Sequence, residues 1–224
     1  ISTGSLSNGL VGHWTFDGKD TIVNTAYDRS GRGNNGTLTN GPIRAQGKIG
    51  QGLEFDGVND FVDIGNPSSL GLTGAMTVSA WVWVDGYAGG VSSRFVSKSG
   101  GSRGWELTIE DSDDKVYFQM SSDCADAGTK NVGTTNTVPL GQWVHYIGVY
   151  EPSAALRIYK NGVLDNSNTT SIPASQCNAG NNVRIGVRGD GIPGTFTDGK
   201  IDDVRIYNRA LSASEIQRLY NMGR

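Results

Sequence analysis

Short stretches of alternating apolar and polar residues, separated by glycine-rich turns, run along most of the chain. Residues 76–84 alternate most strictly, with Val78 and Val82 on one face of a strand and Trp81 and Trp83 on the other. Successive side chains of a strand point to opposite faces of its sheet, so this pattern predicts a strand. The two tryptophans can form an aromatic platform, although packing against the sheet is the expected role of both.

The same pattern predicts further short strands. They are expected at residues 10–16, 37–39, 52–55, 61–64, 94–97, 105–109, 116–120, 143–150, 156–160, 183–187 and 200–207. The pair Asn161–Gly162 favours a type I′ hairpin turn. Ser212 and Glu215 form a capping box that predicts one terminal helix. The fold class is therefore all-β, a two-sheet antiparallel β-sandwich with one short C-terminal helix.

Composition is consistent with one such domain in a chain of 224 residues. The 33 glycines have no collagen period and indicate many tight turns. A net charge of −3 without a basic run argues against a nucleic-acid partner. No apolar run is long enough for membrane insertion. We predict a linker-like N-terminal segment at 1–9, which suggests a module of a larger chain, and one domain at 10–224.

The two cysteines, Cys124 and Cys177, lie in polar segments rich in Ser, Asn and Asp. Free structural thiols are usually buried among apolar residues, so this setting favours one disulfide between two loops. Two unpaired surface thiols are the alternative. A disulfide indicates an oxidising compartment, and we expect an extracellular protein, secreted or at the cell surface.

Several segments carry a resemblance to a known family. They are LVGHWTFD at 10–17 with DRSG at 28–31, GLEFDG at 52–57 with TVSAWV at 77–82, and IDDVRIYNRALS at 201–212. Together they resemble the laminin G-like (LamG) branch of the concanavalin A-like lectin/glucanase superfamily, from about residue 10 to 220. The resemblance implies a jelly roll of two curved sheets. It does not fix a function, because the superfamily holds lectin modules, adhesion domains and glycosidases.

The resemblance also implies a calcium ion that joins the first strand, the segment after the first loop and the last strand. The matching positions are Asp17, the turn at Asn35 and Gly36, and Asp202, with Asp28 as an alternative ligand. Alternation places Asp202 on the core side of its strand, where a carboxylate needs a cation or hydrogen-bond donors. We expect a structural Ca²⁺. In the alternative, Asp17 is a turn residue and backbone N–H groups satisfy Asp202.

A catalytic site is not expected. Glucanases of the superfamily carry a Glu-x-Asp-x-(x)-Glu strand, and the nearest segment here has Glu106 and Glu110 with Thr108 in the middle position. The missing carboxylate would orient and tune the nucleophile, so we predict no enzyme activity and keep a glycoside hydrolase as a minor alternative. His13 and His145 both lie inside predicted strands, where packing is the commoner role.

The function expected is a non-catalytic module that binds a polysaccharide or other glycan. Such sites combine aromatic faces with directed polar groups, often on loops of a rigid sandwich. The candidate residues share this chemistry and lie in or beside loops: Tyr87, Arg94, Arg103, Trp105, Arg188 and Asp190. For each, ordinary surface or core packing is the alternative. A protein-adhesion or spacer module with a protein partner is the alternative function.

Overall fold

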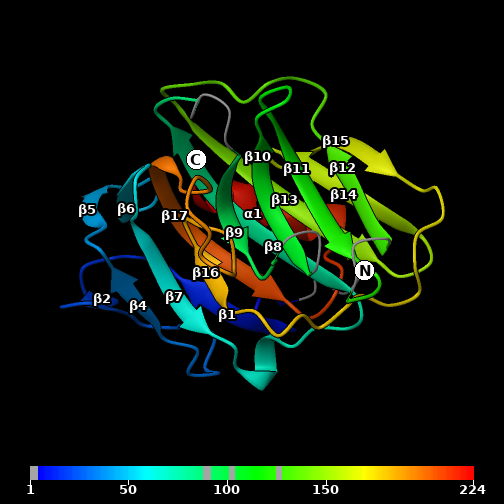
Figure 1. The fold of residues 1–224 in the computed structure, drawn as a ribbon, viewed down its shortest axis with the longest axis horizontal. Helices are drawn as coiled ribbons and strands as arrows, with labels where there is room; N and C mark the ends of the chain where they lie inside the picture. Colours follow the sequence, from blue (N-terminus) through cyan, green and yellow to red (C-terminus); the bar gives the residue numbers. More distant parts are fainter. Residues whose placement is uncertain (1–4, 88–91, 101–103, 125–127) are drawn as a thin grey trace.

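The computed structural model describes residues 5–87, 92–100, 104–124 and 128–224. These residues form two antiparallel sheets packed face to face (Figure 1), which confirms the predicted β-sandwich. Sheet A contains, in spatial order, β15 (Val163–Asn168), β14 (Ala155–Lys160), β13 (Trp143–Glu151), β8 (Met76–Val84), β17 (Asp198–Tyr207), β6 (Gln51–Asp56) and β5 (Ile43–Gln46), with β1 (Leu10–Trp14) paired to β17.

Sheet B forms the other layer. It contains, in spatial order, β12 (Thr129–Gly133), β11 (Lys115–Ser121), β10 (Trp105–Glu110), β9 (Ser93–Ser97), β16 (Val183–Ile185), β7 (Phe61–Gly65), β4 (Gly36–Thr39), β3 (Thr25–Ala26) and β2 (Thr21–Ile22). A 3-10 turn, η1 (Ser68–Leu70), precedes β8, and the helix α1 (Ala213–Met222) follows β17.

The main core fills the space between the sheets. Alternate residues of facing strands enter it, among them Val82 of β8, Ile201 of β17 and Leu107 of β10, each of which is buried. Burial of apolar surface on this scale is the dominant favourable term in folding. The alternate positions of the same strands therefore face outward and are free to carry other chemistry.

A second apolar cluster lies between α1 and the outer face of sheet A. Ile216 and Leu219 of α1 pack there against Ile147 and Tyr207. The predicted capping box begins this helix, because Ser212 accepts from the N–H of Glu215 and donates its own N–H back to the carboxylate. The helix buries Trp81, whose ring stacks with those of His145 and Tyr220 at centroid distances of 4.7 and 5.6 Å, and these two rings also stack with each other at 6.3 Å. The packing role expected for Trp81 is confirmed, whereas Trp83 stays partly exposed.

Five strands were not among the ranges predicted from the sequence. β2 and β3 lie inside a segment interpreted as loop, while β5, β12 and β15 are polar strands of the sheet margins. Such strands carry little apolar alternation because only one face, or neither, enters the core. The first strand also ends at Trp14 instead of Phe16, whose φ of 58° takes the chain out of extended conformation.

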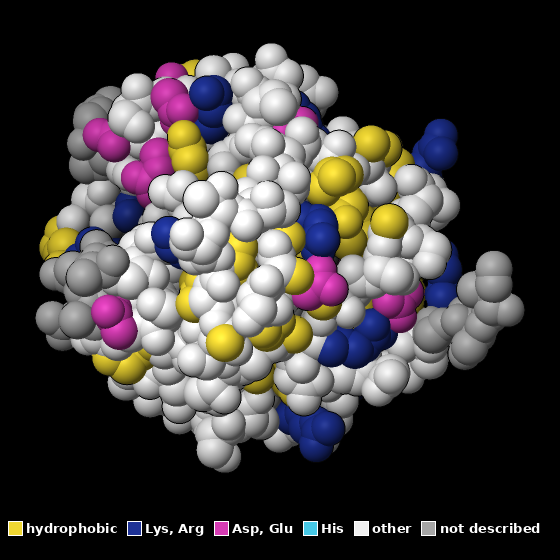
Figure 2. Space-filling model, turned by 90° about the vertical axis from the view of Figure 1, so that its right-hand side faces the viewer, with side chains coloured by type: hydrophobic (Ala, Val, Ile, Leu, Met, Phe, Trp, Pro, Cys, Tyr) yellow, Lys and Arg dark blue, Asp and Glu magenta, His cyan; other side chains and the backbone are white. Residues whose placement is uncertain are grey.

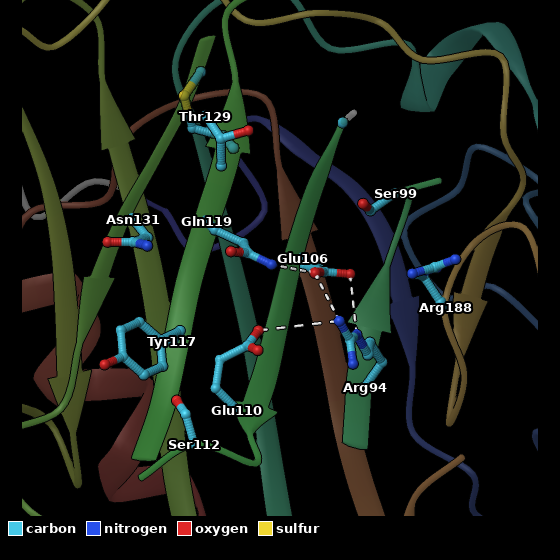
Figure 3. Close-up of a pocket in the computed structure, with 12 residues that line it drawn as sticks. Arg94, Ser99, Glu106, Glu110, Ser112, Tyr117, Gln119, Thr129, Asn131 and Arg188 are labelled. Atoms are coloured by element: carbon cyan, nitrogen blue, oxygen red, sulfur yellow. Dashed lines mark hydrogen bonds and ion pairs between the residues drawn. The ribbon is translucent and has the colours of Figure 1, made fainter. Parts of the chain in front are cut away.

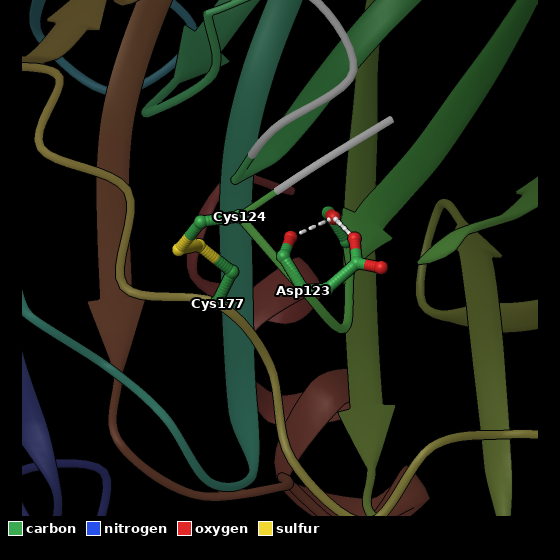
Figure 4. The surroundings of a disulfide bond; sticks show 4 residues. Asp123, Cys124 and Cys177 are labelled. Atoms are coloured by element: carbon green, nitrogen blue, oxygen red, sulfur yellow. Dashed lines mark hydrogen bonds between the residues drawn. A yellow bond between two sulfur atoms is a disulfide. The ribbon is translucent and has the colours of Figure 1, made fainter. Parts of the chain in front are cut away.

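The predicted disulfide between Cys124 and Cys177 is present, with their Cα atoms 5.4 Å apart. It joins the segment after β11 to the loop that precedes β16 (Figure 4). The N–H of Cys177 donates to the carbonyl of Ser121, so the backbone supports the same junction. This junction lies beside the strands that form the candidate site.

The N-terminal residues of the described chain pack against the sandwich. Residues 5–9, predicted as linker-like, form a turn in which Leu6 packs beside the helix cluster and Asn8 accepts from Arg209. The predicted boundary at residue 9 stays a prediction.

Within the described ranges, no helix is long and apolar enough to span a membrane.

Candidate functional site

A hollow of about 480 Å³ lies on the outer face of sheet B, over β9 to β12. We call it the groove. Polar side chains from these strands and from the loop after β16 point into it (Figure 3). The residues that carry its chemistry are Arg94, Glu106, Glu110, Tyr117, Gln119, Asn131 and Arg188.

Strand register produces this convergence. Glu106 of β10 lies opposite Ser97 of β9 and opposite Gln119 of β11, and Gln119 lies opposite Asn131 of β12. A polar row therefore crosses four neighbouring strands on one face. Trp105 and Leu107, the neighbours of Glu106 in the chain, point the other way into the main core.

A β-bulge keeps Arg94 on the groove face. Leu107 pairs with Val96, but Thr108 pairs with Arg94, so Phe95 is the extra residue. Phe95 and Val96 are both buried in the core although they are consecutive. Bulges of this kind re-aim side chains and are frequent beside functional sites.

Glu106 is the centre of the polar cluster and is 1% exposed. Its Oε2 accepts from Ser97 at 3.1 Å and from Nε of Arg94 at 3.4 Å. Its Oε1 accepts from Nη2 of Arg94 at 3.5 Å and from the amide of Gln119. Donors on both oxygens stabilise the buried carboxylate and hold it in one orientation.

Glu110 differs from Glu106 although both are on β10. It is partly exposed, accepts from the Ser92 hydroxyl at 3.0 Å and lies 4.0 Å from Arg94. Burial raises the pKa of its carboxyl above the usual value, and Arg94 opposes that shift. The groove thus holds one carboxylate fixed by hydrogen bonds and a second whose pKa is raised by burial.

Tyr117 gives the groove an aromatic surface. Its ring lies over Gly133, where an added Cβ would come within 2.5 Å of the ring. Its hydroxyl donates to Asp113 at 3.0 Å, and burial together with this bond raises the pKa of Tyr117. Glycine at position 133 is therefore what lets the ring lie close to the sheet.

Arg188 enters the groove from the loop after β16. Its Nε and Nη2 donate to the two oxygens of Asp190 at 2.8 and 3.0 Å, which fixes the plane of the guanidinium. Gly189 has Ser99 and Asn182 backbone atoms within 3 Å of its ideal Cβ position. The loop can pack this closely on β9 only because position 189 is glycine.

The family of the chain follows from a family model described as the concanavalin A-like lectin/glucanases superfamily, which matches residues 56–217. The chain belongs to this superfamily. No curated protein sequence matches it.

Solved structures share the fold of this superfamily member. Domain 4 of AbnA, a GH43 extracellular arabinanase of Geobacillus stearothermophilus in complex with arabinotriose, is 24% identical with a TM-score of 0.71, over 94% of this chain and 98% of that one. The binding domain of Paraclostridial Mosquitocidal Protein 1 is 17% identical with a TM-score of 0.75, over 97% and 53%. The chain spans about half the length of that toxin domain.

A third similar structure is the ligand-binding domain of botulinum neurotoxin serotype D in complex with N-acetylneuraminic acid. It is 15% identical with a TM-score of 0.64, over 96% of this chain and 51% of that one. At these identities the likeness establishes the shared fold. The two toxin structures are binding domains, and the arabinanase domain is a complex with arabinotriose.

The groove brings together part of the ligand set predicted for this superfamily member. Arg94 and Arg188 line it, and Asp190 orients Arg188. Trp105 is 1% exposed in the main core, so it packs the sandwich and offers no surface to a ligand. Tyr87 does not line the groove, and its hydroxyl donates to the carbonyl of Val138.

Arg103 lies outside the described residues. Tyr117, Gln119 and Asn131 were not among the binding residues predicted from the sequence. The signal for two of them was available, because the acidic turn 111–114 predicts a hairpin. Its pairing of Glu110 with Lys115 fixes Glu106 opposite Gln119.

The predicted calcium positions of the superfamily fall into two separate groups. In the first, Asp28 accepts from His13 N–H, from Ser30 and from Asn34 N–H, with both carboxylate oxygens in use. Asn35 accepts from the N–H of Asp28. These bonds organise the loop between β3 and β4, where Gly36 begins β4.

Asp17 and Asp202 form the second group, at the turn 47–51. Asp17 Oδ1 accepts from the N–H of Gln51 at 2.9 Å, and Asp202 Oδ2 accepts from the N–H of Ile49 at 2.8 Å. Asp202 is fully buried, and its Oδ1 has no hydrogen-bond partner among the described residues. Burial raises the pKa of Asp202 to about 7. The carboxylate thus lacks one partner that a proton or a cation would supply.

The prediction from alternation that Asp202 lies on the core side of its strand is wrong. The β17–β8 register shifts between Asp202 and Arg205, and Asp203 has a φ of 45°. Ile201 and Val204 both enter the main core, so this bulge turns Asp202 toward the turn 47–51 instead. Among the described residues no three His, Cys, Asp or Glu side chains gather as a metal cluster.

Proposed function

We propose that the chain is a non-catalytic, extracellular carbohydrate-binding module and that the groove holds a neutral saccharide chain. The observation that carries this proposal is the convergence of guanidinium, carboxylate and amide groups on one face of four strands, beside the Tyr117 ring. Sugar hydroxyls both donate and accept hydrogen bonds, and these groups offer both. The apolar face of a pyranose or furanose stacks on an aromatic ring.

The charge of the groove favours a neutral ligand. Arg94 and Arg188 are matched by Glu106 and Glu110 among the described lining residues. On the face seen in Figure 2, several acidic side chains gather at the upper left, and other acidic and basic side chains are spread over the rest of that face. A polyanion would require a basic surface, and an apolar partner would require a contiguous hydrophobic patch.

Two observations support an extracellular setting. The disulfide between Cys124 and Cys177 is stable in oxidising compartments. AbnA, whose domain 4 shares the fold, is an extracellular arabinanase. The structure of that domain is a complex with arabinotriose, which makes arabinan the first polymer to test.

We expect Tyr117→Ala and Gln119→Ala each to weaken binding of the preferred neutral polysaccharide about tenfold, the loss of roughly 1.4 kcal/mol of contact. Affinity electrophoresis in gels containing arabinan, xylan, β-glucan or mannan measures this. Tyr27→Ala is the matched control, since Tyr27 is exposed beside β3 at the far edge of sheet B. Retention by no neutral glycan would contradict the proposal and favour a protein-adhesion or spacer module.

A glycosidase is the second candidate, because Glu106 and Glu110 do share the groove. Both oxygens of Glu106 are already engaged by Arg94, Ser97 and Gln119, so neither is free to attack a sugar. Thr108 between them donates to the carbonyl of Ser93 and supplies no carboxylate. We expect no release of reducing ends from any bound polysaccharide. Release that Glu106→Gln abolishes would establish the enzyme.

We also propose a structural Ca²⁺ at the turn 47–51. The residues present fit it in part: the unpartnered Oδ1 of Asp202 offers an oxygen ligand, and Asp17 contacts the same turn. With no cluster of three carboxylates in the described chain, backbone carbonyls and water must complete the shell. Asp28, Asn35 and Gly36 belong to the other loop and are left out of this proposal.

A further inference from the structure

A second hollow, of about 440 Å³, lies on the outer face of sheet A, on the opposite side of the sandwich from the groove. We call it the tryptophan notch. Its side chains include Lys48, Trp83, Trp143 and Lys200, and its described lining contains no Asp or Glu. An aromatic surface with two ammonium groups has no role in the proposed binding at the groove.

Register again brings these residues together. Trp83 of β8 lies directly opposite Trp143 of β13 and opposite Lys200 of β17. The centroids of the two indole rings are 6.1 Å apart and the ring planes are inclined at 65°, so the rings form a corner and not a flat platform. One ring can stack on a sugar while the other contacts its edge.

The notch is open because α1 ends beside it. Tyr220 and Gly223 cover Trp81, but Trp83 and Trp143 remain partly exposed. The Trp83 indole N–H donates to Asp85 at 2.8 Å, which fixes the ring in this exposed position. An aromatic side chain that is already held in one orientation and exposed to water loses little conformational entropy when a ligand stacks on it.

Two lysine ammonium groups line the notch. Lys48 has no carboxylate partner among the described residues and lies 5.1 Å from the Trp81 ring centroid. Lys200 lies 5.4 Å from the Trp83 centroid, with Asp85 and Glu54 at 3.6 and 3.9 Å. The ammonium of Lys48 is therefore the group best placed to attract an anion.

We propose that the tryptophan notch binds a sugar unit that bears an anionic group, a uronate carboxylate or a sulfate. The sugar ring stacks in the corner of the two indoles, and its anionic group pairs with Lys48 and, more weakly, with Lys200. The module would then hold saccharide on both outer faces, a neutral chain in the groove and an acidic one in the notch. The overall charge of −3 opposes unspecific attraction of polyanions.

Affinity electrophoresis tests this with polygalacturonate, its methyl ester, dextran sulfate and dextran. We expect the wild-type protein to be retained by polygalacturonate or by dextran sulfate, and the polymer that retains it shows whether the anionic group is a carboxylate or a sulfate. Retention by the two neutral polymers should be weaker. Trp143→Ala should weaken it about tenfold. Lys48→Ala should remove the preference for the acidic polymer over its neutral counterpart.

Lys160→Ala, on β14 of the same sheet, is the matched charge control and should leave retention unchanged. Lys48→Ala changes a partly exposed side chain, so the test survives if Trp143→Ala fails to fold. No wild-type retention by either acidic polymer, or equal losses in Lys48→Ala and Lys160→Ala, would overturn the proposal. Tyr117→Ala should leave retention by the acidic polymers unchanged. A failure of the binding proposed for the groove can therefore be distinguished from a failure of the binding proposed for the notch.

Discussion

Arg94→Ala is expected to lower the free energy of unfolding by about 3–5 kcal/mol, because it leaves Glu106 buried without its cation. The Glu106 side chain is 1% exposed and that of Arg94 is 10% exposed, so the ion pair is largely shielded from water. Ser97 and Gln119 remain as donors and keep the loss toward the lower end. Urea denaturation measures the change.

Two further variants distinguish the stability lost with the ion pair from the stability lost with the packing of the Arg94 side chain. Arg94→Met with Glu106→Gln removes both charges at similar volume and should recover most of the loss. Arg157→Ala is the matched control, since its partner Glu151 is 45% exposed, and it should cost less than about 1 kcal/mol. A change below 1 kcal/mol in Arg94→Ala would show that the pair does not organise the groove.

Asp202→Asn is expected to stabilise the calcium-free protein at pH 8 by up to about 4 kcal/mol and to abolish its response to calcium. The pKa of Asp202 rises from 3.8 to about 7 on folding, chiefly through burial. The folded state therefore holds the proton more tightly than the unfolded state. Without a cation, the contribution of Asp202 to stability is greatest below pH 4, falls as pH rises to about 7, and is level above that.

Calcium should reverse this loss by pairing with the ionised carboxylate. Thermal melts with calcium and with chelator should differ by several degrees at pH 8 and little at pH 5, where the proton already occupies the site. Asp111→Asn, an exposed carboxylate in the β10–β11 turn, is the control and should keep the full response. An equal calcium response in Asp202→Asn, or none in the wild type at pH 8, would contradict a cation at this position.

The parts of the fold that depend on local pattern could be predicted from the sequence. Val78 and Val82 alternate with polar or aromatic neighbours, and Ser212 with Glu215 caps the helix, so strand β8 and helix α1 follow from nearby residues. The disulfide followed from the polar surroundings of both cysteines. For β8 and α1 the determining residues lie within one strand or one turn, and for the disulfide they lie in the short segment around each cysteine.

The parts that depend on register could not be predicted in this way. The bulge at Phe95 aims Arg94 into the groove, and the bulge after Asp202 turns that carboxylate away from the core. Both interrupt the period-two pattern that assigns faces. Trp83 and Trp143 meet because β8 pairs with β13, across 60 residues of chain, which no short motif records.

Binding of saccharide in the groove on sheet B can be mapped residue by residue in an NMR titration of the labelled protein with an oligosaccharide. Arabinotriose is the first ligand to try, followed by fragments of whichever neutral polymer retains the protein. The proposal predicts amide shift changes confined to β9–β12 and the loop that carries Arg188 and Asp190. Shift changes that centre on another surface, such as the loop of Tyr87 or the tryptophan notch, would contradict it.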